Sequence, residues 1–157
     1  MTVLVTGGLG FIGSKVVLQL LERNIDVLVT DLDIEKNKNK LEKSILKIGK
    51  DKDKIKYIKL DITDHQQIEN IFQNNKIDSV INLAYGIGSI CEENPLLASK
   101  INIVGTTSMF DMVVKYKIRR LVFASSETVY GANQEFFGNR AVTEDDYSGI
   151  NNHFYTY

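Results

Sequence analysis

Along the chain, short runs of consecutive apolar residues alternate with segments in which apolar residues recur at helical spacing. The first apolar run, residues 3–5, enters a glycine-rich turn over residues 7–13, and apolar side chains then recur at helical spacing. These later positions are Ile12, Val16, Val17, Leu20 and Leu21. The pattern predicts a strand, a tight turn and an amphipathic helix.

The same alternation continues to residue 124. Further strands are expected at residues 25–30, 55–60, 79–84 and 121–124. The helices expected between them are a lysine-rich one within residues 35–59, one carrying Ile68, Ile71 and Phe72, and a long one that ends near Tyr116. The fourth apolar run is nearly continuous, which predicts burial on both faces of a sheet. Residues 125–157 are polar and irregular.

Two of these helices carry recognisable start signals. Thr63, with Gln66 three residues later, matches a capping box. Asn94 is a suitable cap for the long helix, and Pro95, the only proline, fits its first helical position.

Regular alternation of strands and helices predicts the α/β class, with a doubly wound parallel sheet (Rossmann fold) and helices on both faces. We expect one domain over residues 1–157, with the first strand at the centre of the sheet. A ligand would lie across the carboxyl edge of the sheet, at the topological switch point.

Composition narrows the classes of partner. The chain has 157 residues, is 43% hydrophobic and 25% charged, and carries a net charge of −1, so no nucleic-acid partner is expected. Ten lysines within residues 35–59 are interspersed with four acids, which indicates a solvated helix face.

The first apolar run is too short for a membrane span or a signal peptide. Cys91 is the only cysteine, which favours a cytoplasmic location. His65 and His153 are isolated, and no metal site is expected.

The glycine-rich turn has a chemical interpretation. Gly7, Gly10 and Gly13 let the backbone turn sharply between a strand and a helix. A diphosphate at that point would meet free N–H groups and the positive end of the helix dipole. The context of strand, turn and helix is the one that a dinucleotide-binding site requires.

Two acidic residues follow later strands. Asp31 lies 18 residues beyond Gly13, close to the ~20 expected for an acid that holds the adenosine ribose hydroxyls. A carboxylate there would repel a 2′-phosphate, so the sequence favours NAD over NADP. Asp61 could accept a hydrogen bond from the adenine amino group, although local capping would also explain an acid at that position.

Taken together, these motifs resemble the amino-terminal half of the extended short-chain dehydrogenase/reductase family, in its NAD-dependent epimerase/dehydratase group. The segments that resemble it are Thr-Gly-Gly-Leu-Gly-Phe-Ile-Gly at 6–13, Asp31, Asp61-Ile62, Asn82-Leu83-Ala84, Asn102-x-x-Gly105-Thr106 and residues 125–131. Tyr85 departs from the usual second alanine of the fourth-strand motif. The resemblance implies that NAD is bound by Gly7, Gly10, Phe11, Ile12, Gly13, Asp31, Asp61, Ile62, Leu83, Ala84 and Asn102.

The resemblance also implies a catalytic serine and a Tyr-x-x-x-Lys motif. Ser126 would orient the substrate hydroxyl, with Ser125 as the alternative. Tyr157, 31 residues beyond Ser126, would be the acid/base, and Tyr155 is the other candidate. For both tyrosines the lysine would lie past residue 157, and Tyr147 has no lysine four residues later. We therefore expect an amino-terminal portion that lacks the substrate domain and is inactive alone.

The function implied is transient hydride transfer between a nucleotide sugar and NAD, with net epimerisation. Dehydratases of the family carry a Thr-Asp-Glu run where this sequence has Ser126-Glu127-Thr128, which resembles epimerases and simple reductases more than dehydratases. The alternatives are a nucleotide-sugar reductase or dehydratase, and a catalytically silent dinucleotide-binding module. The resemblance further implies a homodimer for the full-length protein.

Overall fold

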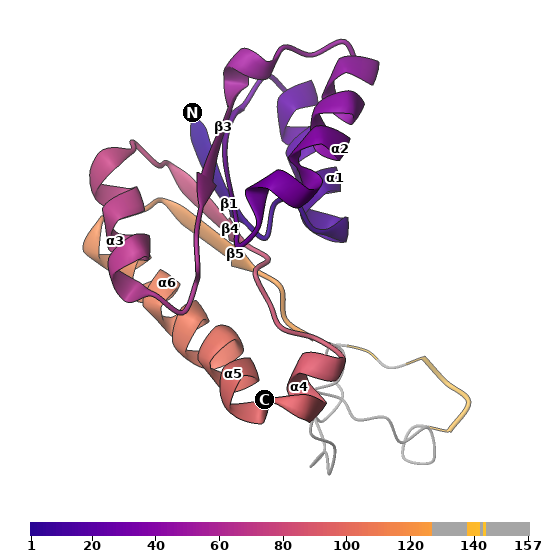
Figure 1. Ribbon diagram of the computed structural model, residues 1–157, viewed down its shortest axis with the longest axis vertical. Helices are drawn as coiled ribbons and strands as arrows, with labels where there is room; N and C mark the ends of the chain where they lie inside the picture. Colours follow the sequence, from indigo (N-terminus) through magenta and orange to yellow (C-terminus); the bar gives the residue numbers. More distant parts are fainter. Residues whose placement is uncertain (127–137, 142, 144–157) are drawn as a thin grey trace.

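The computed structural model describes residues 1–126, 138–141 and 143, and within them the strands form one parallel sheet (Figure 1). The strands are β1 (Thr2–Thr6), β2 (Asp26–Asp31), β3 (Ile55–Lys59), β4 (Ser79–Asn82) and β5 (Arg120–Phe123). Their order is β3-β2-β1-β4-β5, and every neighbouring pair is parallel. The prediction of a doubly wound parallel sheet with the first strand at its centre is confirmed.

Helices cover both faces of the sheet. They are α1 (Phe11–Glu22), α2 (Ile34–Lys47), α3 (His65–Asn74), α4 (Ser89–Glu93), α5 (Pro95–Ser99) and α6 (Thr106–Lys115), with a 3-10 turn η1 (Lys52–Lys54) and a π-helical turn η2 (Lys100–Gly105). Figure 1 shows α1 and α2 on one side of the sheet and α3 and α6 on the other. No helix in the described part of the chain is long and apolar enough to cross a membrane.

Because successive side chains of a strand point to opposite faces of the sheet, the buried apolar side chains form two cores, one on each face. The core under α1 and α2 includes Val3, Val5, Val27, Val29, Val17, Leu21, Leu41 and Ile45. The core under α3 and α6 includes Leu4, Leu28, Val80, Ile68, Ile71, Phe72, Met109 and Met112. The continuous apolar run of β4 packs on both sides, since Val80 belongs to one core and Ile81 packs against the other.

The capping box predicted at Thr63 is wrong by one residue. The cap of α3 is Asp64, whose carboxylate accepts from Gln67 N at 3.1 Å. That N–H holds the pKa of Asp64 below its ordinary value. Thr63 is used elsewhere, because its N–H and hydroxyl both donate to Asp61 Oδ1, at 2.9 and 2.7 Å. An Asx turn at Asp61 therefore sets the start of the helix.

The buried stripe of α1 also differs from the expected one. The helix buries Gly13, Val17 and Leu21, whereas the side chain of Ile12 is 62% exposed. Gly13 packs directly against the backbone of Gly7, which fixes the rotation of the helix about its axis. The buried stripe therefore begins at Gly13, which has no side chain, and the spacing of apolar residues does not predict this start.

The long helix expected after Asn94 begins as predicted but is not one regular helix. Asn94 Oδ1 accepts from Leu97 N at 3.0 Å, and Pro95 occupies the first turn. The π-helical turn η2 then separates α5 from α6. The short helix α4 before Asn94 was not expected from the sequence.

Tyr57 on β3 offers a test of burial at the edge of the sheet. Its hydroxyl oxygen is buried and has no hydrogen-bond partner among the described residues. Burial, together with the negative charge of Glu42, raises the pKa of Tyr57 to about 12. The folded state therefore favours the protonated phenol.

We expect Tyr57→Phe to be at least as stable as the unchanged chain at pH 7, because no buried hydroxyl is left unpaired. Above pH 10 the unfolded tyrosine ionises while the folded one stays protonated up to about pH 12. The unchanged chain should therefore lose stability relative to Tyr57→Phe across this interval. Urea denaturation at pH 7 to 12 measures it, and a constant difference at all pH values would contradict the shift.

Candidate functional site

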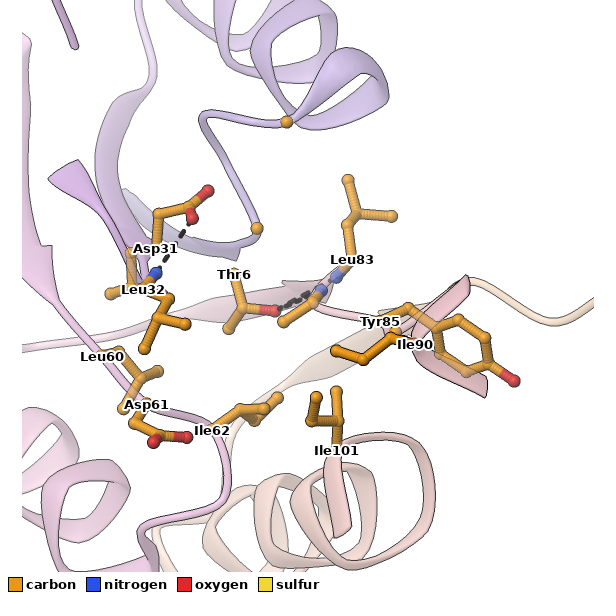
Figure 2. Close-up of a pocket in the computed structure, with 15 residues that line it drawn as sticks. Thr6, Asp31, Leu32, Leu60, Asp61, Ile62, Leu83, Tyr85, Ile90 and Ile101 are labelled. Atoms are coloured by element: carbon orange, nitrogen blue, oxygen red, sulfur yellow. Dashed lines mark hydrogen bonds between the residues drawn. The ribbon is translucent and has the colours of Figure 1, made fainter. Parts of the chain in front are cut away.

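The segments that follow β1, β2, β3 and β4 meet at the carboxyl edge of the sheet and enclose a pocket of about 350 Å³ (Figure 2). Its lining consists of Thr6, Gly7, Gly10, Thr30, Asp31, Leu32, Leu60, Asp61, Ile62, Leu83, Ala84, Tyr85, Gly86, Ile90 and Ile101. The lining is mainly apolar, with polar groups contributed by threonines and two acids. Such a crevice at the switch point is where open α/β sheets bind ligands.

The turn after β1 requires glycine at two positions. Gly7 has φ +62°, and a Cβ there would lie 2.7 Å from the carbonyl oxygen of Leu83. At Gly13 a Cβ would collide with the carbonyl oxygen of Gly7. These close approaches bring the start of α1 down onto the end of β1, beside the segment that leaves β4. The sequence motif thus reflects backbone packing as well as turn geometry.

The amino terminus of α1 is left without a capping side chain. Its cap is Gly10, and no acidic residue lies in the first turn. By contrast, Asp33, Asp64 and Asn94 cap α2, α3 and α5 through their side chains. Because Gly10 lines the pocket, the positive end of the α1 dipole is available to an anion there.

A buried threonine connects the two central strands at the pocket. The hydroxyl of Thr6 donates to Asn82 Oδ1 at 2.5 Å and accepts from the N–H groups of Leu83 and Ala84, both at 3.1 Å. Asn82 also donates to Thr106 Oγ1 at 3.4 Å. Leu83 N makes the last backbone bond to β1, at 3.2 Å to Thr6 O, so β4 ends at Asn82 and not at residue 84 as expected. Thr6 was included in the glycine motif, but its side chain was assigned no role from the sequence.

Asn102, in η2, has a comparable role in holding the backbone that follows β4. Its side chain accepts from Gly86 N at 2.7 Å and donates to Gly86 O at 3.0 Å. The thiol of Cys91 donates to the same carbonyl oxygen at 3.2 Å. Gly105, three residues later, packs so closely on Ile62 that a Cβ would lie 3.0 Å from its carbonyl oxygen. The helix beginning at η2 therefore holds two walls of the pocket in place.

The two acids stand at the same end of the pocket, as Figure 2 shows. One carboxylate oxygen of Asp31 accepts from Leu9 N at 3.1 Å and the other from Leu32 N at 2.9 Å, which links it to the glycine turn. Asp61 directs Oδ1 to Thr63, as described above. Each carboxylate oxygen can accept more than one hydrogen bond, so a ligand donor can be added at Asp31.

The expected site residues fall into three groups. Those that line the pocket are Gly7, Gly10, Asp31, Asp61, Ile62, Leu83 and Ala84. Those that do not are Gly13 and Asn102, which are buried behind it, and Phe11 and Ile12, which are exposed on the first turn of α1. Ser126 is partly buried and follows β5, while Tyr147, Tyr155 and Tyr157 lie outside the described residues. No cluster of three metal-ligating side chains occurs in the part that the structure describes.

Several lining residues were missed by the sequence reasoning. Thr30 is the clearest case, because it is 1% exposed and its hydroxyl has no hydrogen-bond partner among the described residues. It lies opposite Thr6 in the register of β1 and β2. The only feature of the sequence that could have indicated Thr30 is its position, because both threonines lie near the end of a strand.

This pair of threonines allows a matched test. Thr6→Val should lower the free energy of unfolding by about 1–3 kcal/mol, because Asn82 Oδ1 and Ala84 N lose the hydroxyl that they bond, while Leu83 N keeps the carbonyl oxygen of Thr6. Thr30→Val removes a hydroxyl that has no described partner and should leave stability unchanged or raise it by up to about 1 kcal/mol. Urea denaturation compares the two variants. Equal destabilisation by both would mean that Thr30 is bonded after all.

Comparison with known proteins places these features in a family. The model of the NAD dependent epimerase/dehydratase family matches residues 3–154. A UDP-glucose 4-epimerase of Arabidopsis thaliana is 38% identical over 136 residues, which cover 85% of this chain and 39% of that protein. A UDP-glucose 4-epimerase of Caenorhabditis elegans is 33% identical, covering 95% of this chain and 43% of that protein.

Solved structures agree with this assignment. The UDP-glucose 4-epimerase of Bifidobacterium longum, in complex with NAD+ and UDP, superposes with a TM-score of 0.71 and 32% identity over 83% of this chain and 38% of that one. The UDP-glucose 4-epimerase of Thermus thermophilus in complex with NAD gives a TM-score of 0.67 and 29% identity, over 80% and 38% of the two chains. The chain thus spans about two fifths of the length of these proteins.

Proposed function

Because the chain belongs to the NAD-dependent epimerase/dehydratase family, we propose that it is the NAD-binding part of an enzyme that epimerises a nucleotide sugar. The observation that carries the proposal is the pocket at the switch point, which combines a glycine turn, an uncapped helix terminus and Asp31. The relatives that are UDP-glucose 4-epimerases support a UDP-sugar as the substrate.

The residues present fit NAD. The N–H groups at the start of α1 would bind the diphosphate, where Gly7 and Gly10 leave room for it. Asp31 would accept the hydroxyls of the adenosine ribose, and Asp61 would accept from the adenine amino group. Ile62, Leu83 and Ala84 supply apolar walls for a flat base. Gly13 and Asn102 would act indirectly, since they position α1 and Gly86.

The chemistry proposed is hydride removal from a sugar carbon and its return to the opposite face. Bound NAD would supply the acceptor for that hydride and its source on return. Tyr157 would take the proton of the sugar hydroxyl and later return it, and Ser126 would donate a hydrogen bond to the same oxygen. A free tyrosine has a pKa near ~10, so a neighbouring cation is needed to favour its ionised form.

Location and assembly are part of the same proposal. We propose a cytoplasmic protein, which the single cysteine supports, and a homodimer at full length. The dimer is inferred from family resemblance. Apolar side chains exposed on η2 and α6, Ile103, Val104 and Val114, are compatible with a further helix packing there.

The role of Asp31 can be tested by calorimetric titration with NAD and NADP. We expect NAD to bind at least tenfold more tightly, because the carboxylate accepts the ribose hydroxyls and repels a 2′-phosphate. Asp31→Ala should weaken NAD binding about 10- to 100-fold, the range for hydrogen bonds to a charged group. Asp31→Asn, which removes only the charge, should reduce the preference for NAD. Unchanged NAD affinity in Asp31→Ala would remove the assignment.

The catalytic assignment requires the full-length protein and UDP-galactose as substrate. Tyr157→Phe should lower kcat by about 10²- to 10⁴-fold, as expected for loss of an acid/base group, and Ser126→Ala should also lower it. Tyr155→Phe is the matched control and should change kcat no more than a few-fold. Loss of activity in Tyr155→Phe alone would transfer the role to Tyr155. Absence of any epimerase activity in the unchanged protein would favour a silent dinucleotide-binding module.

A further inference from the structure

Tyr85 occupies the end of the pocket that lies opposite Asp31 and Asp61 (Figure 2). It lines the pocket, yet 42% of the residue is exposed. We propose that the ring of Tyr85 binds the nicotinamide riboside half of NAD where it leaves the pocket, and so determines how tightly that half is held. This inference rests on the proposed function, and it concerns a side chain where the family's fourth-strand motif has alanine.

The topology of the sheet carries the argument. Asp31 and Asp61 follow β2 and β3, on one side of the central strand β1, whereas Tyr85 follows β4, on the other side. A dinucleotide whose adenosine half lies at the two acids and whose diphosphate lies at the β1 turn must cross β1. Its second half then arrives over the segment that leaves β4, where Tyr85 is the first large side chain after the apolar wall.

Tyr85 also stands at the level of the proposed catalytic serine. Asn82 of β4 is opposite Phe123 of β5, and Ala124 N donates to Asn82 O at 3.2 Å. Tyr85 is three residues past Asn82, and Ser126 is three residues past Phe123. The segments that carry the two residues therefore leave the same edge of the sheet, from neighbouring strands.

The backbone on both sides of Tyr85 is fixed. Ala84 N donates to the hydroxyl of Thr6, and both polar groups of Gly86 are bonded to the side chain of Asn102. The Cα of Tyr85 therefore has little freedom, and the ring can move only by rotation about its own side-chain bonds. An aromatic ring held in this way presents contact area at low entropic cost.

The chemistry of the ring suits this half of the cofactor. Burial raises the pKa of Tyr85 above its ordinary value, and the neighbouring Cys91 adds to the effect, so the phenol stays protonated at neutral pH. It can donate a hydrogen bond but does not serve as a base. The oxidised nicotinamide ring is flat and positively charged, and aromatic faces attract such groups.

The test compares NAD with ADP, which contains the adenosine and the diphosphate but no nicotinamide riboside. Tyr85→Leu should weaken NAD binding about tenfold in calorimetric titration and leave the affinity for ADP within twofold. Tyr85→Phe keeps the ring and should bind NAD within twofold of the unchanged chain. Ile87→Ala is the matched control, since Ile87 is 75% exposed on the same segment and does not line the pocket. It should change neither affinity.

Three results would overturn the inference. The first is unchanged NAD affinity in Tyr85→Leu, and the second is an equal loss for NAD and ADP, which would place the effect at the adenosine end. The third is a Tyr85→Phe variant as weak as Tyr85→Leu, which would exclude a contact made by the ring. Failure of the unchanged chain to bind either ligand would instead overturn the proposed function. Thermal unfolding of each variant verifies that the fold is retained.

Discussion

The hydroxyl of Thr6 is the interaction on which the pocket depends. Parallel strands that separate at their carboxyl ends expose backbone N–H groups that no neighbouring strand can satisfy. Here the Thr6 hydroxyl accepts from Ala84 N, shares the N–H of Leu83 with the carbonyl oxygen of Thr6, and in turn donates to Asn82. The crevice can therefore open between β1 and β4 without leaving buried donors unpaired. Its apolar wall begins at the point where these bonds end the strand.

A second property of the site is that much of it is built from backbone. Gly7 and Gly13 bring two segments into contact, Gly10 leaves a helix terminus uncapped, and Gly86 is held by the side chain of Asn102. The side chains of Asn102 and Thr6 hold the backbone groups that they bond. Binding at this edge would thus depend on the course of the chain, with Asp31 and Tyr85 adding selectivity at the two ends.

The sequence was sufficient for the parallel sheet, its central first strand and the principal walls of the pocket, because these follow from alternating apolar runs and from glycine spacing. It did not predict the cap of α3, since Thr63, Asp64 and Asp61 all offer capping side chains and only the folded turn selects Asp64. Ile12 is exposed because Gly13 packs against the backbone of Gly7 and so sets the rotation of the helix. The role of the Thr6 side chain was not predicted, because a threonine at the end of a strand has no pattern of its own.

The π-helical turn η2 limits where residues can be inserted into or deleted from this chain. Asn102 lies within η2 and reaches Gly86, while Met109 and Met112 of α6 lie in the core on the same helical rod. An α-helix advances by about 100° per residue, so deleting one residue from the wider turn would rotate everything before it relative to α6. Asn102 would then point away from Gly86 while the methionines stayed buried. An insertion or deletion in η2 would therefore break the bonds between Asn102 and Gly86.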